Sequence, residues 1–378
     1  MSELLAETVR ITKISPHNNA DRLEIATIKG WPCIVPKGQY KEGQMVVYFP
    51  PDTIMPYSLH AFLNITNYCA SLPKSMNTTS RRVKAVRLRG IPSYGVVITT
   101  KQCVDYFEKY MAETSTISVP YFVSCMLRPG FNVAKWFQLD KWQPMIRCNE
   151  GNAAKEHPRF YKYTSIEHWR NYPNVLHENE QIIITEKIHG TNCRLGFIED
   201  TDEHGNQTKV IMAGSHKVRR QRFHTKPNGE EVECLYWQPF TWHPRLRDML
   251  LRIDEDNPLA SSIMVYGEIY GRGVQNLHYD ATSEKKFRVF DIAIDGYYLN
   301  YDEMLFYLDT YKIPFVPVLY VGPYSPEIVE RYTVGNTLLT TDKHIREGCV
   351  IKPIKERDHP KIGRVILKSV SVDYLSTK

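Results

Sequence analysis

The stretch QIIITEKIHGTNCRLGF, residues 181–197, places a single lysine at the end of an apolar segment. The run Ile182–Ile184 is typical of a buried strand, and a polar, glycine-containing turn follows Lys187 almost at once. A buried strand end holds an amine rigidly, which suits an amine that attacks a phosphoryl or carbonyl centre. A lone lysine at such a position more often packs its stem on the sheet and extends its ammonium to solvent. The assignment therefore depends on residues further along the chain.

Charged residues recur in later apolar segments that are typical of strands. They are Glu268 in VYGEIYG, Asp291 after Phe290 in FRVFDI, Glu347 and Lys352 in REGCVIKP, and Lys368 in RVILKSVS. An unpaired charge within a buried strand is costly, so their joint presence is best explained by a shared polyanionic ligand and a metal ion. Phe290 alone discriminates nothing, because an aromatic residue on a strand usually belongs to a core.

This ordered set resembles the covalent nucleotidyltransferase superfamily, which contains polynucleotide ligases and RNA-capping enzymes. A lysine motif, a Glu-containing strand, an EGhhhK strand and a terminal lysine strand follow one another in that superfamily. More narrowly, the segments GWPCIVPKGQYKEGQMVVYF, TEKIHGTN, GEIYG, FDI, REGCVIK and LKSVSVDYL are similar to the Deinococcus/Naegleria-type ATP-dependent RNA ligases. The similarity covers nearly the whole chain.

The resemblance implies a role for each matching residue. Lys187 attacks the α-phosphate of ATP, and a divalent cation, Mg2+ or Mn2+, assists it. The residues implied at the nucleotide are Ile184, Thr185, Glu186, Asn192, Glu268, Phe290, Lys352 and Lys368. Within that set, the segment 184–186 borders the adenine, Phe290 stacks on it, and the two later lysines contact the α-phosphate. Glu347 holds the hydrated metal ion, and Glu268 binds ribose hydroxyls or a metal-bound water.

Two features leave alternatives open. Much of the superfamily has Asp-Gly where this chain has His189-Gly190, and a neutral imidazole does not replace a carboxylate, so the role of His189 is open. Arg219, Arg220 and Arg222 form a basic cluster that suits a triphosphate or an RNA strand, but a solvated loop fits the cluster at least as well.

The fold class predicted is α+β with two domains, because 378 residues exceed what one hydrophobic core usually serves. Residues 1–135 are expected to form an OB-like β-barrel, with short strands in 9–14, 23–30, 32–38 and 44–51. A strand pair, 81–90 and 94–99, is expected to flank a connection at Ile91–Ser93, and its five cations between 81 and 89 suit either a charged edge or a phosphate-contacting face.

The polar segment 136–158 is the predicted linker, and residues 159–378 are the predicted nucleotidyltransferase domain. By the resemblance, this is an ATP-grasp-like ligase adenylation domain with antiparallel sheets and flanking helices. The helical patterns within it are residues 243–253 and 325–332.

Composition limits the remaining classes. Forty-eight Lys and Arg against 42 Asp and Glu give a net charge of +6, which is compatible with a polyanionic partner. The eight cysteines have no CxxC or CxxH spacing, so neither a zinc site nor a disulfide framework is indicated. No apolar run suits a membrane span or a signal peptide, and a cytoplasmic, monomeric protein is expected.

The predicted function is ATP-dependent sealing of RNA 3′-hydroxyl and 5′-phosphate ends through a lysyl-AMP, at nicks in an RNA duplex or an RNA/DNA hybrid. One alternative is a GTP-dependent capping guanylyltransferase. Capping enzymes carry an OB domain after the last lysine motif, whereas only ten residues follow Lys368, so this alternative is disfavoured. The other alternative is an inactive protein that binds nucleic acid through the OB face alone.

Overall fold

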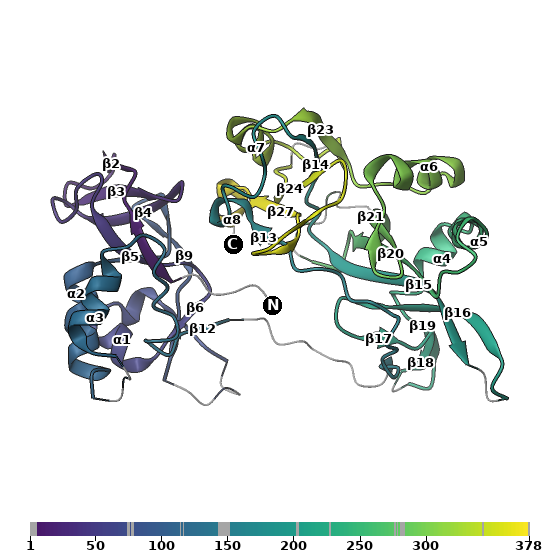
Figure 1. Cartoon of the computed structure of the whole chain (residues 1–378), viewed down its shortest axis with the longest axis horizontal. Helices are drawn as coiled ribbons and strands as arrows, with labels where there is room; N and C mark the ends of the chain where they lie inside the picture. Colours follow the sequence, from purple (N-terminus) through teal and green to yellow (C-terminus); the bar gives the residue numbers. More distant parts are fainter. Residues whose placement is uncertain are drawn as a thin grey trace. The chain divides into compact units, whose positions relative to one another are not determined.

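The structure is a computed structural model of the chain (Figure 1). It describes residues 6–73, 76, 79–113, 115, 117–142, 152–201, 204–226, 228–275, 277, 279, 284–341 and 344–376. The chain divides into two compact units, one of Met1–Ile146 with Leu375–Lys378 and one of Arg147–Tyr374. The division falls inside the predicted linker, of which residues 143–151 lie outside the described part. The predicted domain bounds remain a prediction.

The first unit contains several small, mainly antiparallel sheets. Its three-stranded sheets are β1 (Glu7–Arg10), β5 (Met45–Phe49) and β11 (Val96–Thr99), and β2 (Lys13–Pro16), β3 (Leu23–Ile28) and β4 (Trp31–Pro36). The others are the pair β9 (Ala85–Leu88) and β10 (Ile91–Tyr94), and the sheet of β12 (Asp140–Lys141), β6 (Thr53–Met55), β8 (Arg81–Arg82) and β7 (Ala70–Ser71). Among the described residues these strands do not close into one barrel, which corrects the expected β-barrel.

The predicted connection at Ile91–Ser93 was wrong. Those residues belong to β10, and the chain reverses one step earlier, at Arg89 and Gly90. Both turn residues have positive φ, 49° and 88°, which matches the twist of a tight two-residue hairpin. The sequence Arg-Gly does not predict this turn, because Arg rarely adopts the left-handed region.

Helices that the sequence patterns did not predict complete this unit. They are α1 (Tyr57–Phe62), α2 (Thr100–Tyr110) and α3 (Val119–Met126), with a short 3-10 turn, η1 (Thr66–Tyr68). Helix α2 is capped by Thr99, whose side chain accepts from the Gln102 N–H in a capping box. Phe107 of α2 stacks on Phe122 of α3 with ring centroids 4.0 Å apart, so the helices bury a core beside the strands.

The second unit is built around two larger sheets. The five-stranded sheet has the order β13 (Glu167–His168), β27 (Leu367–Val370), β24 (Gly348–Pro353), β14 (Gln181–Glu186) and β23 (Val318–Pro323). The six-stranded sheet has the order β17 (Arg219–Arg220), β16 (Gln207–Ser215), β15 (Thr191–Thr201), β20 (Ser262–Tyr270), β21 (Lys286–Ile294) and β22 (Tyr297–Tyr298). The remaining pairs are β18 (Phe223–Thr225) with β19 (Glu231–Glu233), and β25 (Asp358–His359) with β26 (Gly363–Arg364).

Helices cover one face of each large sheet (Figure 1). They are α4 (Pro239–Trp242), α5 (Arg245–Asp256), α6 (Tyr301–Tyr311) and α7 (Pro326–Thr333), with η4 (Trp169–Asn171). The last helix, α8 (Val372–Ser376), follows β27. Leu246 and Leu250 of α5 join the core of the six-stranded sheet, and Val329 of α7 packs with Ile184 on the five-stranded sheet. Tyr266 and Val350, one from each sheet, belong to a common cluster on the opposite faces. The two sheets therefore pack against each other there.

The apolar runs of the second unit were predicted well. QIIITE, KVIMAG, SIMVYGEIY, FRVFDIAI and GCVIKP all lie in strands, and the helical patterns at 243–253 and 325–332 fall largely in α5 and α7. RVILKSV was expected to be one strand, but it is split between β26 and β27.

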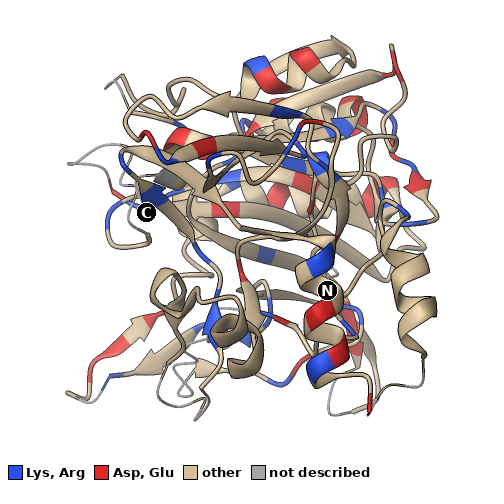
Figure 2. Cartoon of the chain, turned by 90° about the vertical axis from the view of Figure 1, so that its left-hand side faces the viewer, with Lys and Arg blue, Asp and Glu red and all other residues tan. Residues whose placement is uncertain are grey.

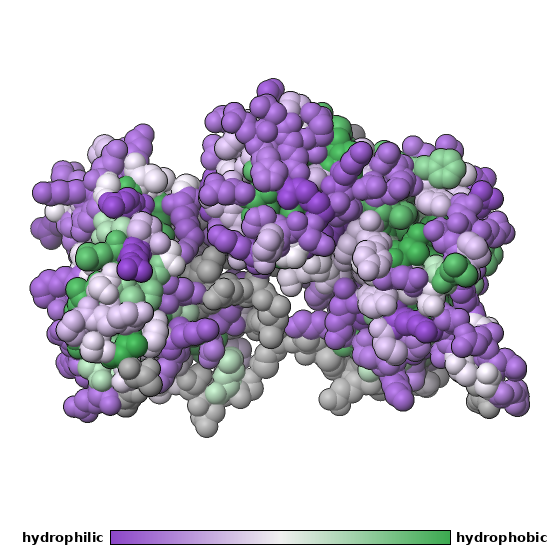
Figure 3. All heavy atoms as spheres, viewed as in Figure 1, coloured by the Kyte–Doolittle hydropathy of each residue, from purple (hydrophilic) through white to green (hydrophobic). Residues whose placement is uncertain are grey.

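The face seen in Figure 3 is mainly hydrophilic, with small apolar patches. Basic and acidic residues are interspersed along the ribbon rather than segregated (Figure 2). Within the described residues, no helix has the length and apolar character that a membrane crossing requires. The cytoplasmic location and the monomeric state stay predictions.

Candidate active site

Lys187 follows β14 directly, and its backbone is held from two sides. Its N–H donates to the Gly348 carbonyl at 3.0 Å, and the preceding N–H of Glu186 donates to the Pro317 carbonyl at 2.8 Å. The isoleucines that precede it in β14 are fully buried, so the strand cannot shift without disturbing the core. The side chain of Lys187 keeps 26% exposure, which leaves the amine reachable.

The amine of Lys187 faces the carboxylate of Glu347, at the start of β24. Nζ lies 2.9 Å from Glu347 Oε1. Burial alone would raise the pKa of Glu347, but the Lys187 ammonium, followed by His189, lowers it to about 2. Burial acts to lower the pKa of Lys187, whereas Glu347 and Glu268 outweigh it and raise that pKa. Without ligands, the amine is therefore protonated and not nucleophilic.

Glu268 in β20 brings a second carboxylate from the other large sheet. Burial raises its pKa to about 8, although the charge of Lys187 and an N–H from Gly190 oppose the shift. A Cβ on Gly190 would lie 2.2 Å from the Ile269 carbonyl oxygen and 2.9 Å from Glu268 Cγ, so this close approach requires glycine. The turn after Lys187 thus lies directly against the Glu268 strand.

We expect Glu268→Gln to stabilise the metal-free chain at pH 8. The folded state keeps a proton on Glu268 up to about pH 8, whereas the unfolded chain releases it near the ordinary glutamate pKa of 4.5. Unfolding therefore releases a proton between these values, and the wild type loses stability as pH rises through that range. The gain should be on the order of 2 kcal/mol at pH 8 and near zero at pH 5.

Urea unfolding of both chains with a chelator at the two pH values measures this gain. The exposed Glu255, on α5, provides the control variant Glu255→Gln. A stability difference that does not change between pH 5 and pH 8 would contradict a raised Glu268 pKa.

His189 lies beside Glu347. Its backbone N–H donates to the Tyr279 hydroxyl, and its Nδ1 lies 3.1 Å from the Tyr374 hydroxyl and 3.2 Å from Glu347 Oε2. Three elements therefore hold the residue that occupies the position of the superfamily's Asp. Neither tyrosine was predicted for the site, since nothing in the local sequence links 279 or 374 to 189.

The residues before Lys187 divide between the two faces of the sheet. Ile184 is fully buried with Val329 of α7. The Glu186 carboxylate is also buried, where it accepts from the Thr337 hydroxyl and from the Leu338 N–H at 2.8 Å. Thr185 pairs with Val350, whose next cross-strand neighbour is Lys368, so these three residues share the opposite face. The adenine contacts expected of 184–186 stay a prediction, and Thr185 is the residue whose side chain lies on that face.

Two further predicted residues lie on the six-stranded sheet. Asn192 pairs directly with Glu268, and its Oδ1 is buried with no hydrogen-bond partner in the described part of the chain. Phe290 is half-buried, with its ring 4.8 Å from that of Tyr163 in a T-shaped contact. Asn192 thus adjoins the carboxylate site, while stacking of Phe290 on a base stays a prediction.

Lys352 pairs with other carboxylates than Lys187 does. It is 4% exposed, and its ammonium is ion-paired with Asp291 and, at 3.1 Å, with Glu356. Arg364 bonds the same two carboxylates, and Tyr163 donates to Asp291. The Asp291 pKa falls to about 2, because Arg364 and Lys352 outweigh the opposing effect of burial. These ion pairs suggest a structural role for Lys352, which is an alternative to the predicted phosphate contact.

Comparison with known families and structures identifies the family and the fold of the chain. The family model described as RNA ligase matches residues 180–370, and an OB-fold domain model matches residues 5–100. Since the first match covers just over half of the chain, it decides the family. The chain belongs to the RNA ligase family.

Solved structures of an RNA ligase from Naegleria gruberi share the fold. The structure of that protein with PPi is 20% identical, with a TM-score of 0.71 over 100% of this chain and 99% of that one. A mutant with AMP and Mn gives the same values, and another with ATP and Mn is 19% identical with a TM-score of 0.69 over 99% of each chain. At this identity the likeness establishes the fold alone. Comparison with curated proteins gives no match.

A divalent cation fits the carboxylate site of this RNA ligase family member. Glu347 Oε2 is buried and has no hydrogen-bond partner among the described residues, and the raised pKa of Glu268 reflects a buried carboxylate that lacks sufficient compensating charge. No cluster of three His, Cys, Asp or Glu side chains suited to a metal occurs in the described ranges. Mg2+ is commonly held by one or two carboxylates, waters and substrate phosphates, so a two-carboxylate site agrees with that chemistry.

The arginine cluster of this RNA ligase family member is largely engaged with its own chain. Arg219 donates to the Lys155 carbonyl, Arg220 to the Asn152 side chain, and Arg222 to Glu233. These contacts agree with the structural alternative for the cluster. They leave no direct support for a triphosphate contact.

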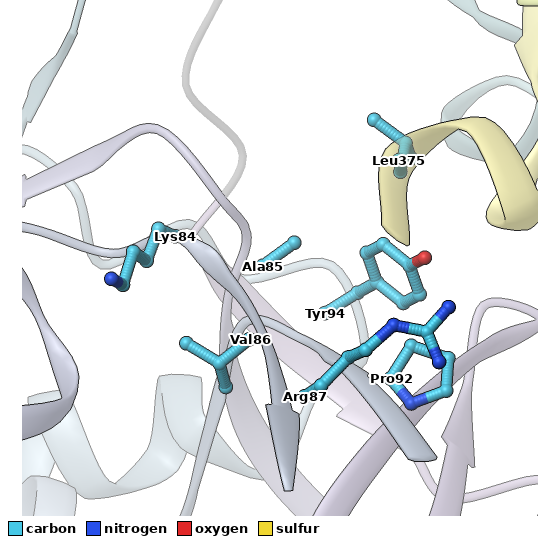
Figure 4. Close-up of a pocket in the computed structure, with 7 residues that line it drawn as sticks. All are labelled: Lys84, Ala85, Val86, Arg87, Pro92, Tyr94 and Leu375. Atoms are coloured by element: carbon cyan, nitrogen blue, oxygen red, sulfur yellow. The ribbon is translucent and has the colours of Figure 1, made fainter. Parts of the chain in front are cut away.

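Several cations of the basic segment 81–89 in the first unit bond to their own chain. Arg82 pairs with Asp52 and lies 3.5 Å from the Trp142 ring centre, and Arg81 donates to Ser71. Figure 4 shows Lys84, which precedes β9, and Arg87 of β9 in the lining of a pocket, together with Pro92 and Tyr94 of β10. The mixture of cations and an aromatic ring suits a nucleic-acid backbone, so contact of this unit with RNA stays a prediction.

Proposed function

We propose that this RNA ligase family member joins an RNA 3′-hydroxyl to a 5′-phosphate with ATP, through a covalent AMP on Lys187. The observation that carries the proposal is the amine of Lys187, fixed at a strand end 2.9 Å from Glu347 and within the electrostatic influence of Glu268. A nicked RNA duplex or an RNA/DNA hybrid is the proposed substrate.

In the first step, the neutral amine attacks the α-phosphorus of ATP. A P–N bond forms, the P–O bond to pyrophosphate breaks, and the amine gives up a proton. AMP then passes to an RNA 5′-phosphate, and the 3′-hydroxyl displaces AMP. Each step is an in-line displacement that depends on positioning and on stabilisation of charge. The cation, proposed as Mg2+ or Mn2+, would supply charge neutralisation at the phosphate oxygens.

The residues of this chain prepare the amine for that attack. Glu347 holds the Lys187 ammonium at the strand end, and the oxygens of Glu347 and Glu268 would hold the cation directly or through water. With these carboxylates engaged by a cation, they would no longer favour the ammonium, and burial would lower the pKa of Lys187. We further propose that Lys368 contacts the α-phosphate from the face that it shares with Thr185.

Incubation of the purified chain with α-labelled ATP or GTP and a divalent metal tests the proposal. Label retained from ATP after denaturing electrophoresis, followed by sealing of a nicked RNA duplex, is the expected result. Label from GTP alone would indicate capping chemistry. No label from either nucleotide would indicate a protein that only binds.

Glu347→Gln should slow formation of the covalent AMP by about 10²- to 10³-fold. The amide keeps the size of the side chain but removes the charge that contacts Lys187 and would hold the cation. Single-turnover labelling with ATP measures the rate. Glu330→Gln serves as control, because Glu330 is exposed in an ion pair with Arg170. Equal rates for wild type and Glu347→Gln would exclude the proposed role of this carboxylate.

A further inference from the structure

Tyr374 is a buried residue of the C-terminal helix α8 with its hydroxyl in the active site. It is 2% exposed, and its ring meets the His189 ring edge-on with centroids 5.6 Å apart. The hydroxyl forms a 3.1 Å hydrogen bond with His189 Nδ1. A buried tyrosine hydroxyl needs a hydrogen-bond partner, and the partner here is a residue next to the Lys187–Glu347 pair.

Two oxygens compete for the same nitrogen of His189. Tyr374 OH lies 3.1 Å from Nδ1, and Glu347 Oε2 lies 3.2 Å from it. An imidazole nitrogen carries one proton or one lone pair, so it forms one full hydrogen bond at a time. The contact with Tyr374 meets hydrogen-bond geometry, whereas the contact with Glu347 Oε2 is a close charge contact, and that oxygen has no hydrogen-bond partner in the described part of the chain.

Backbone hydrogen bonds fix the position of the segment before Tyr374 relative to Glu347. Gly348 pairs with Val370 across β24 and β27, and the Ser371 N–H donates to the Glu347 carbonyl at 2.8 Å. Tyr374 follows within one helical turn of Ser371. Its hydroxyl therefore has a fixed position relative to Glu347, which a side chain on a loop would lack.

We propose that Tyr374 is a positioning residue that keeps His189 from bonding to Glu347. By engaging Nδ1, its hydroxyl leaves Glu347 Oε2 available to the divalent cation or to a water on it. Without that hydroxyl, the imidazole N–H would turn to the nearby carboxylate oxygen. The cation would then have to displace both His189 and Lys187 from Glu347. This inference rests on the proposed function.

Tyr374→Phe tests the inference, since the ring and its packing remain and only the hydroxyl is lost. We expect Mn2+ to bind about 10-fold or more weakly, within the 10- to 100-fold range typical of residues that orient metal ligands. Mn2+ affinity is read from the electron paramagnetic resonance signal of the free ion, with the full chain and an ATP analogue that cannot transfer AMP. The rate of Lys187 labelling should fall at low metal and recover at saturating metal.

Tyr48→Phe is the matched control, because it also removes a buried hydroxyl, one that donates to the Tyr94 carbonyl at 2.8 Å in the first unit. Both variants should show similar losses of Tm. Unchanged Mn2+ affinity in Tyr374→Phe, or slow labelling that saturating metal does not restore, would overturn the inference. Failure of the wild type to take label from ATP would instead overturn the proposed function.

Discussion

Lys187→Ala should abolish the covalent AMP, with a fall in labelling rate of at least about 10⁴-fold, as for removal of other covalent nucleophiles. No other lysine lies in contact with Glu347 in the described part of the chain, so no second amine is positioned to replace it. Ligation of RNA that already carries a 5′-adenylate should survive far better, because that substrate bypasses the first step. Single-turnover assays with ATP and with adenylated RNA measure the two rates.

Lys209→Ala is the matched control for this experiment. Lys209 is 20% exposed and ion-paired with Asp254, so its removal causes a comparable loss of contacts away from the site. Label retained on Lys187→Ala at a rate near that of the wild type would show that another group is the nucleophile.

Lys352→Met should lower the free energy of unfolding by about 3 kcal/mol, the lower end of the range for breaking a buried ion pair. The substitution leaves the buried Asp291 and the half-buried Glu356 with Arg364 as their remaining cation, which limits the loss. At a temperature where the variant is folded, its labelling rate should stay within about 10-fold of the wild type if Lys352 is structural. Urea unfolding and labelling with ATP measure the two effects.

Lys355→Met is the control, since Lys355 is exposed three residues away. A stable Lys352→Met chain with a labelling rate more than about 10²-fold below that of the wild type would instead support the phosphate contact implied by the family resemblance.

The sequence predicts the second unit better than the first. Its strands are long apolar runs, and the order of Lys187, Glu268 and Glu347 along them is enough to indicate one site. The fold brings those three charges together from two different sheets. In the first unit the strands are short. Of the two positive-φ residues in the turn at 89–90, only Gly90 is of a type that predicts such a turn.

The partners of the site residues could not be predicted, because they come from distant segments. Lys352 belongs to an ion network with Glu356 and Arg364. The lysine motif alone does not show whether Lys352 pairs with such carboxylates or contacts a phosphate. Tyr374 reaches His189 across 185 positions of sequence through the path of β27 and α8. Periodicity reports which face of an element is apolar, but it does not report which polar groups meet across a fold.

Mass spectrometry of the chain after reaction with ATP and Mg2+, digested under conditions that preserve a phosphoramidate, tests most directly whether Lys187 is the nucleophile. One AMP adduct is expected, on Lys187, and it should be lost when pyrophosphate is added before digestion. An adduct on a different residue, or no adduct from a chain that seals RNA, would show that Lys187 is not the nucleophile.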